Sequence, residues 1–267
     1  MDKIWLWHKN NILAKMKDSP GNPYREYVED FRFLLGNQYS QFHDRQVEIG
    51  GTSRQDIIDK VQSLEEYYGE VDGFIKNRIR PDKQSNLRSQ AKLRPTILEE
   101  FCCYLFKDLP EIRDLGLDFY NKGIFAGLGV NEKGTAMVKK KDVDFCIGKE
   151  INARLGNIQE KFIIPIVAVE CKTYTDKTMF SEAQFTAQSL KNGNPDVRAY
   201  VVSESNQIGL DQIPSQTPLD QYYVLREQKD KPIDADIVYD FFCEVRKVVE
   251  STNSARAKQT YGKMIIR

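Results

Sequence analysis

The chain carries the segment FIIPIVAVECK at residues 162–172, in which a mostly apolar run leads into Glu170, Cys171 and Lys172. Such a run predicts a strand that is buried on both faces. Residues two apart in a strand share a face, so Glu170 and Lys172 point to one side of the sheet and Cys171 to the other. A carboxylate at the edge of so apolar a strand needs a partner.

A second short run offers that partner. Residues 143–147, VDFCI, also predict a strand, and Asp144 lies within it. If the two strands pair, two carboxylates and the Lys172 amine converge at one end of a sheet. Carboxylate oxygens suit Mg²⁺, and a bound divalent ion lowers the pKa of its water. The pattern therefore indicates a metal-dependent site able to cleave phosphodiester bonds; a purely structural ion pair between Glu170 and Lys172 is the alternative.

The short pattern is not specific by itself. A chain with 29% charged residues produces Glu-x-Lys by chance, and Glu227-Gln228-Lys229 is a second example. That copy runs into the polar turn Asp230-Lys231-Pro232, and no buried acidic residue precedes it. We therefore interpret it as a solvated strand end.

The composition limits the classes of protein to consider. A length of 267 residues fits one large domain, or one domain with a helical part added. No apolar run of about 18 residues is present, so we expect no membrane span. The first residues lack the features of a signal peptide, so we expect a cytoplasmic protein. Five scattered cysteines indicate reduced core residues. Two histidines are too few to favour a zinc site or Ser-His catalysis.

Basic residues are unevenly distributed although the net charge is zero. They gather in residues 76–94, in 139–141 and in the tail 246–267, and such clusters can neutralise the phosphates of a DNA duplex. An ordinary solvated surface is the alternative for each cluster. The candidate DNA contacts are Arg78, Arg80, Arg88, Lys92, Lys140 and Lys177.

Hydrophobic periodicity predicts a helical region followed by a mixed α/β layer. Residues 23–35 predict a helix that stops at Gly36, and residues 54–68 predict one that begins after a Ser53 cap and stops before Gly69. Residues 76–94 predict a loop or short helix. The remaining expected elements are helices at 96–106, 181–191 and 234–250, and strands at 143–147, 162–172, 199–204 and 221–226. We expect residues 1–94 to form a helical region for DNA recognition or dimerisation, and residues 95–267 to form the catalytic core.

From about Pro95 to Glu250, the order of elements and the placement of Asp144 and the Glu-x-Lys triplet resemble the PD-(D/E)XK nuclease superfamily. Val143 replaces the proline that usually precedes the first aspartate. The segments at 97–101, 141–148, 164–172 and 222–226 look like those of type II restriction endonucleases of the BbvCI kind. The resemblance implies a restriction-endonuclease-like core with a mixed sheet of four or five strands flanked by helices.

The same resemblance implies roles for individual residues. Asp144, Glu170 and the backbone carbonyl of Cys171 would bind Mg²⁺, and Lys172 would orient or deprotonate the attacking water, or stabilise charge. Asp142 is the rival of Asp144, and one or two metal ions remain possible. A glutamate of the preceding helix often assists such a site, so Glu99 and Glu100 are candidates, with Glu100 preferred because the pattern of core residues favours it.

The implied function is that of a type II restriction endonuclease, or a subunit of one, in a bacterial-type restriction-modification system. It would make Mg²⁺-dependent, site-specific cuts in double-stranded DNA and leave 5′-phosphate ends. Each active site cuts one strand, so a second subunit is needed, either identical or related. The alternatives are a structure-specific repair or recombination nuclease and a non-catalytic DNA-binding relative. The sequence does not indicate the recognition site or the stagger between the cuts in the two strands.

Overall fold

The computed structural model describes residues 5–88, 93–156, 158–209, 213–214, 216–228 and 230–259, with side chains for all of these except 158 and 253–259. The chain forms two compact units. The first contains Met1–Asp108, Cys171–Thr173 and Leu225–Tyr239, and the second contains Leu109–Glu170, Tyr174–Val224 and Asp240–Arg267. The first unit therefore extends beyond the expected boundary at residue 94.

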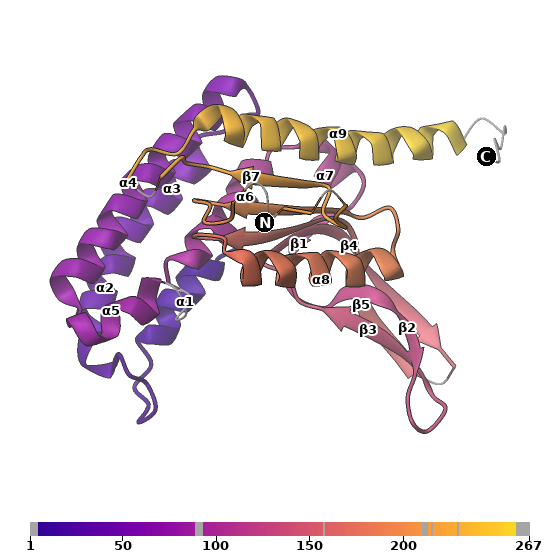
Figure 1. Cartoon of the computed structure of the whole chain (residues 1–267), viewed down its shortest axis with the longest axis horizontal. Helices are drawn as coiled ribbons and strands as arrows, with labels where there is room; N and C mark the ends of the chain where they lie inside the picture. The colour runs from indigo at the N-terminus through magenta and orange to yellow at the C-terminus, as the bar shows by residue number, and fades with distance from the viewer. Residues whose placement is uncertain are drawn as a thin grey trace. The chain divides into compact units, whose positions relative to one another are not determined.

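The first unit is helical (Figure 1). Its helices are α1 (Trp7–Lys15), α2 (Val28–Phe33), α3 (Ser40–Glu48), α4 (Arg54–Arg78), α5 (Pro81–Arg88) and α6 (Pro95–Phe106), with a 3₁₀ turn at Arg25–Tyr27 and a π-helical segment at Leu34–Tyr39. Helix α4 begins at a capping box in which Ser53 and Asp56 bond each other's backbone N–H groups. Its buried residues recur every three or four positions, which gives α4 a continuous apolar face toward the core.

Two expected helix ends are wrong, and both were placed at glycines. The helix expected to stop at Gly36 continues through the π-helical segment into α3, and α4 passes Gly69 and ends at Arg78. A glycine inside a helix costs only about 1 kcal/mol relative to alanine. Burying Tyr39 after the first glycine and Val71 after the second offsets that cost.

The second unit contains a seven-stranded mixed sheet. The strands are β1 (Asp118–Tyr120), β2 (Ile124–Val130), β3 (Ala136–Lys141), β4 (Phe145–Leu155), β5 (Ile158–Lys172), β6 (Arg198–Ser203) and β7 (Gln221–Val224). They run in the order β1-β4-β5-β2-β3, and β6 pairs with both β5 and β7. The sheet exceeds the expected four or five strands because residues 118–141 contribute β1, β2 and β3. The glycines in and around β2 interrupt the usual apolar alternation.

Helices cover the sheet of the second unit on both faces (Figure 1). They are α8 (Lys177–Gly193) and α9 (Ala235–Gln259), and a short helix α7 (Pro110–Asp114) precedes β1. Alternate residues of β6 face the two helices: Val201 packs in a cluster with Ala187 of α8, whereas the ring of Tyr200 contacts that of Phe241 in α9. This is the expected mixed α/β layer, with one helix crossing between core strands.

Within the ranges described above, no helix is both long and apolar enough to cross a membrane.

Candidate functional site

Strands β4 and β5 form the antiparallel pair that the sequence predicts. Phe145 pairs with Val169, and Cys146 pairs with Ala168. Continuing this register by one residue places Asp144 across from Glu170, and residues directly opposite in an antiparallel pair project from the same face about 5 Å apart. The sequence predicts that Asp144 lies within a strand, but it lies in a bend just before β4. Both carboxylate residues are half-buried.

Side chains alternate between the two faces of the sheet along the last residues of β5. Ala168 belongs to a core cluster with Leu190 of α8, so Glu170, two residues later, lies on the face of the sheet that α8 covers. By the same period Lys172 shares the face of Glu170. Cys171 points to the other side, where its Sγ lies 3.9 Å from the Sγ of Cys102 in α6. The backbone therefore presents Asp144, Glu170 and Lys172 on one face.

Asp142, the rival of Asp144, has a different environment. It is exposed, and its Oδ1 accepts a hydrogen bond of 3.1 Å from the backbone N–H of Gly123 in the turn before β2. Gly123 has a φ of 70°, a left-handed conformation that glycine adopts easily. Asp142 thus stabilises a turn, and the geometry favours Asp144 as the partner of Glu170.

The carboxylate of Glu100 is enclosed in the first unit. Its Oε2 accepts hydrogen bonds from the backbone N–H groups of His8 and Lys9 at 2.7 and 3.4 Å, and its Oε1 accepts from the hydroxyls of Tyr39 and Tyr104 at 2.9 and 2.8 Å. Burial raises the pKa of Glu100 to about 7, and these donors oppose the rise. Four donors occupy both oxygens, which leaves no position for a metal ion. These contacts favour Glu99 over Glu100 as the candidate glutamate of α6, and the role of either residue stays a prediction.

His8 belongs to the same buried network. Its Nδ1 lies 2.9 Å from the Thr96 hydroxyl, and its Nε2 lies 2.7 Å from the Tyr67 hydroxyl. Burial lowers the pKa of His8 to about 3, so the ring is neutral. No local pattern in the sequence could reveal this contact, because His8 and Glu100 are 92 residues apart.

The family model of the Bpu10I restriction endonuclease matches residues 90–252, which include α6, Asp144 and the end of β5. The chain belongs to the Bpu10I restriction endonuclease family. No curated protein sequence matches it.

A solved structure described as the native BbvCI A2B2 tetramer at low resolution has the same fold as this Bpu10I-family chain. The two share 20% sequence identity with a TM-score of 0.67, and the match covers 97% of this chain and 98% of that one. It confirms the restriction-endonuclease-like fold with an N-terminal helical region. The predicted resemblance to restriction endonucleases of the BbvCI kind is confirmed as well.

Three of the six basic residues proposed to meet DNA are paired with carboxylates in this Bpu10I-family structure. Arg78 lies 3.8 Å from Asp30, and Lys140 lies 2.9 Å from Glu160. Arg80 lies 3.2 Å from a carboxylate two residues along the chain. Each of these cations must give up a carboxylate partner to bind a phosphate. That exchange reduces the free energy that the cation contributes to DNA binding.

The other three have different surroundings. Arg88, half-buried at the end of α5, and Lys177, exposed at the start of α8, have no ion-pair partner among the residues that the structure describes. Lys92 lies outside the described residues. Arg88 and Lys177 therefore keep their charges available to a partner.

Proposed function

We propose that this chain is a type II restriction endonuclease, or a subunit of one, that makes Mg²⁺-dependent cuts at a specific site in double-stranded DNA and leaves 5′-phosphate ends. One observation carries the proposal: in a member of the Bpu10I family, the β4–β5 register sets Asp144 across from Glu170, and Lys172 follows on the same face.

The residues at this strand end fit Mg²⁺. Asp144 and Glu170 offer hard carboxylate oxygens, and the backbone carbonyl of Cys171 offers a third oxygen. In the part of the chain that the structure describes, no three His, Cys, Asp or Glu side chains are grouped to hold a metal ion. A site with few protein ligands suits Mg²⁺, which keeps several of its waters. When bound, the ion would lower the pKa of a water and offset the charge that builds on the phosphate.

Lys172 acts on the attacking water or on the phosphate. Its half-buried ammonium is on the face that carries Glu170. As a cation it stabilises the negative charge of the transition state, and as a neutral amine it accepts a proton from water. The pH dependence of cleavage distinguishes these roles, because only the second requires Lys172 to lose its proton.

Glu99 is the other candidate acid of α6. It is buried, with 8% of its surface exposed, and it precedes Glu100, whose oxygens are occupied. Helical geometry turns the two side chains about 100° apart, so the network that encloses Glu100 leaves Glu99 on a different side of the helix.

A complete cut requires two such chains. One set of catalytic groups hydrolyses one phosphodiester bond, so cleavage of both strands needs a second subunit, identical or related. The similar BbvCI structure, described as an A2B2 tetramer, supports an assembly of more than one chain.

The test is cleavage of plasmid DNA by the purified chain, alone and together with a related chain from the same gene neighbourhood. With Mg²⁺ we expect discrete fragments whose sequenced ends share one recognition site and carry 5′-phosphates. Cuts that follow DNA junctions or flaps, independent of sequence, would show a repair or recombination nuclease instead. Binding without any cleavage under all these conditions would indicate a non-catalytic relative.

A further inference from the structure

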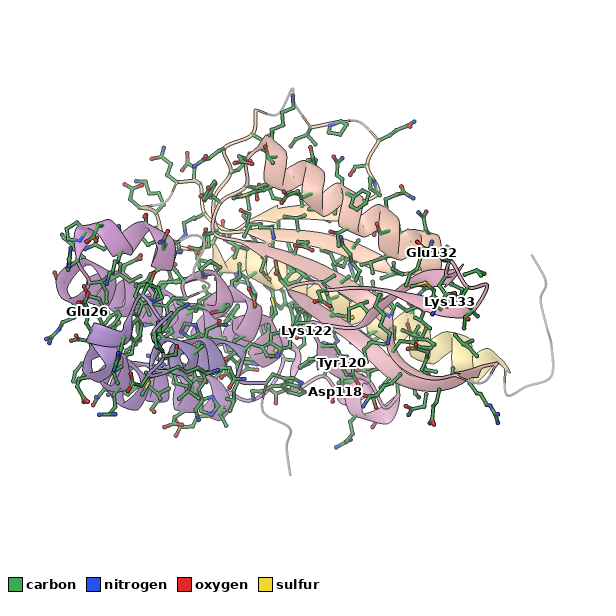
Figure 2. The ribbon with its side chains drawn as sticks, turned by 90° about the horizontal axis from the view of Figure 1, so that it is seen from below. Glu26, Asp118, Tyr120, Lys122, Glu132 and Lys133 are labelled. Carbon is green, nitrogen blue, oxygen red and sulfur yellow. The ribbon has the colours of Figure 1, made fainter. Side chains whose placement is uncertain are left out.

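The β2–β3 hairpin, Ile124–Lys141, is a two-stranded ribbon in the second unit. Ile124 pairs with Ile163 of β5, and the remaining pairs that the structure describes for β2 join it to β3. Figure 2 marks Glu132 and Lys133 at the turn of this hairpin. The ribbon is therefore attached to the sheet at its base and packs against Gly193 of α8 at Ala126 and Gly127, while its outer half extends beyond this contact.

The tip of the ribbon has a defined conformation. The Asn131 side-chain oxygen accepts hydrogen bonds from the backbone N–H groups of Lys133 and Thr135 at 3.0 and 2.9 Å. Gly134 has a φ of 73°, which permits the tight turn. Ordering the tip in advance lowers the entropy that binding would cost.

Three large apolar side chains project from the outer half of the ribbon into solvent. Leu128, Val130 and Met137 are 61%, 69% and 41% exposed. Leu128 and Val130 lie two residues apart on β2 and share one face of the ribbon, whereas Met137 pairs with Gly129 and lies on the other face. Two exposed apolar side chains together on one face of an ordered ribbon indicate a contact surface.

The ribbon is also basic, with four lysines and one glutamate, Glu132. Lys140 pairs with Glu160, and the Nζ of Lys141 lies 5.2 Å from the ring centroid of the exposed Phe185. Lys133 and Lys139 have no ion-pair partner among the residues that the structure describes. The Lys139 side chain lies over Gly129, where a Cβ would lie 2.8 Å from the Lys139 Cε.

Two observations favour DNA over a second copy of the chain. Strand β3 is at the edge of the sheet and ends in Lys139-Lys140-Lys141, and lysines on an edge strand oppose pairing with another strand. A stable protein interface needs about 800 Å² from each partner, more than three apolar side chains supply. The major groove, about 12 Å wide, accepts a two-stranded ribbon, and apolar side chains contact the methyl group of thymine there.

We propose that the β2–β3 hairpin is a DNA-reading ribbon, in which Lys133 and Lys139 contact phosphates while Leu128 and Val130, on one face of the ribbon, meet base edges in the major groove. The inference rests on the proposed function and names the element that reads DNA. The last ribbon residue, Lys141, is only three residues before Asp144, so the base of the ribbon leads directly to the candidate site.

The test compares the variant Lys133→Ala/Lys139→Ala with Lys231→Ala, which removes another exposed lysine from a solvated turn outside the basic clusters. Binding to a fluorescent duplex of about 30 base pairs is measured without divalent metal over a series of NaCl concentrations, with any partner chain that cleavage requires. We expect the double variant to bind more weakly, with a salt slope smaller by about two, and Lys231→Ala to match the unchanged chain. An unchanged slope in the double variant, or an equal loss in Lys231→Ala, would overturn the proposal.

A second variant tests base reading. Leu128→Ser/Val130→Ser should leave the salt slope unchanged and alter the sequences that are cut, as determined by sequencing the ends. If it instead dissociates an assembly of protein chains and leaves DNA binding and cut sites unchanged, the hairpin is a protein interface and the proposal is wrong. Binding without metal is independent of cleavage, so a chain that binds through the ribbon but never cuts refutes the proposed function alone.

Discussion

The β4–β5 register, in which Phe145 pairs with Val169, places Asp144 across from Glu170 when it is continued by one residue. Both residues are half-buried, and a cation near two carboxylates on one face offsets the repulsion between their charges. In a member of a restriction endonuclease family, a divalent ion is the cation that would also serve cleavage.

Glu170→Ala should reduce Mg²⁺-dependent cleavage by at least about a hundredfold, since removing one group that stabilises transition-state charge has an effect of that size. Binding of the duplex should persist. The matched control is Glu227→Ala, which alters the exposed Glu-x-Lys copy and should cut normally. Normal rates in Glu170→Ala, measured by single-turnover plasmid cleavage, would refute the site.

Lys172→Ala should also abolish cleavage and spare binding. Lys172→Arg separates the two roles of this residue, because arginine stays protonated at all accessible pH values. If Lys172 acts as a cation, the arginine variant keeps part of the activity and the same pH profile. If it acts as a base, the arginine variant is as inactive as the alanine variant.

Glu99→Gln should weaken cleavage and raise the Mg²⁺ concentration needed for half-maximal rate. Glu100→Gln should leave that concentration unchanged, because the Glu100 carboxylate binds donors from within the first unit. Titrations of cleavage rate against Mg²⁺ measure both. The reverse ranking would restore Glu100 as the acid of the site.

Glu100 and His8 should give opposite slopes to the pH dependence of stability. Burial raises the pKa of Glu100 from 4.5 to about 7, so its contribution is full at low pH and is lost as pH rises toward 7. Burial lowers the pKa of His8 from 6.5 to about 3, so its contribution is full above 6.5 and is lost as pH falls. Between about pH 5 and 8 the two changes nearly cancel, each about 2 kcal/mol.

Glu100→Gln removes one of these slopes. The free energy of unfolding, measured in urea, should then rise by about 2 kcal/mol more from about pH 5 to 8 than it does in the unchanged chain. Equal slopes for the two proteins would mean that Glu100 titrates in the folded chain as it does in the unfolded one.

Gly193→Ala should destabilise the chain by about 1 to 3 kcal/mol, the usual cost of overpacking. A Cβ at this position, the last residue of α8, would lie 2.5 Å from the backbone of Ala126 and Gly127. Gly69→Ala is the control: it lies inside α4 with open space around it and should stabilise by about 0.5 to 1 kcal/mol. Thermal unfolding midpoints that move in the same direction for both variants would contradict the close contact at Gly193.

Local patterns predicted the elements whose signals are strong over short distances. The apolar run before Glu170 is strand β5, Ser53 caps α4, and residues 96–106 lie in α6. These follow from periodicity and capping, which depend on neighbouring residues alone.

Contacts between distant residues could not be predicted in this way. The enclosure of Glu100 depends on His8 and Tyr39, which are 92 and 61 residues away. The pairing of Lys140 with Glu160 depends likewise on strand register, so a basic run alone could not show which lysines stay available. The choice between Glu99 and Glu100 therefore required the tertiary structure.

The reactivity of the cysteines measures whether the chain is folded, because most of them are buried in the folded chain. Cys102, Cys103, Cys146 and Cys171 are buried, and burial raises the pKa of the Cys146 thiol, whereas Cys243 is partly exposed. A water-soluble thiol reagent should therefore consume one equivalent from native protein and five after denaturation. The measured stoichiometry gives the intact fraction of any preparation without an added label, which matters when a variant loses activity and misfolding must be distinguished from lost chemistry.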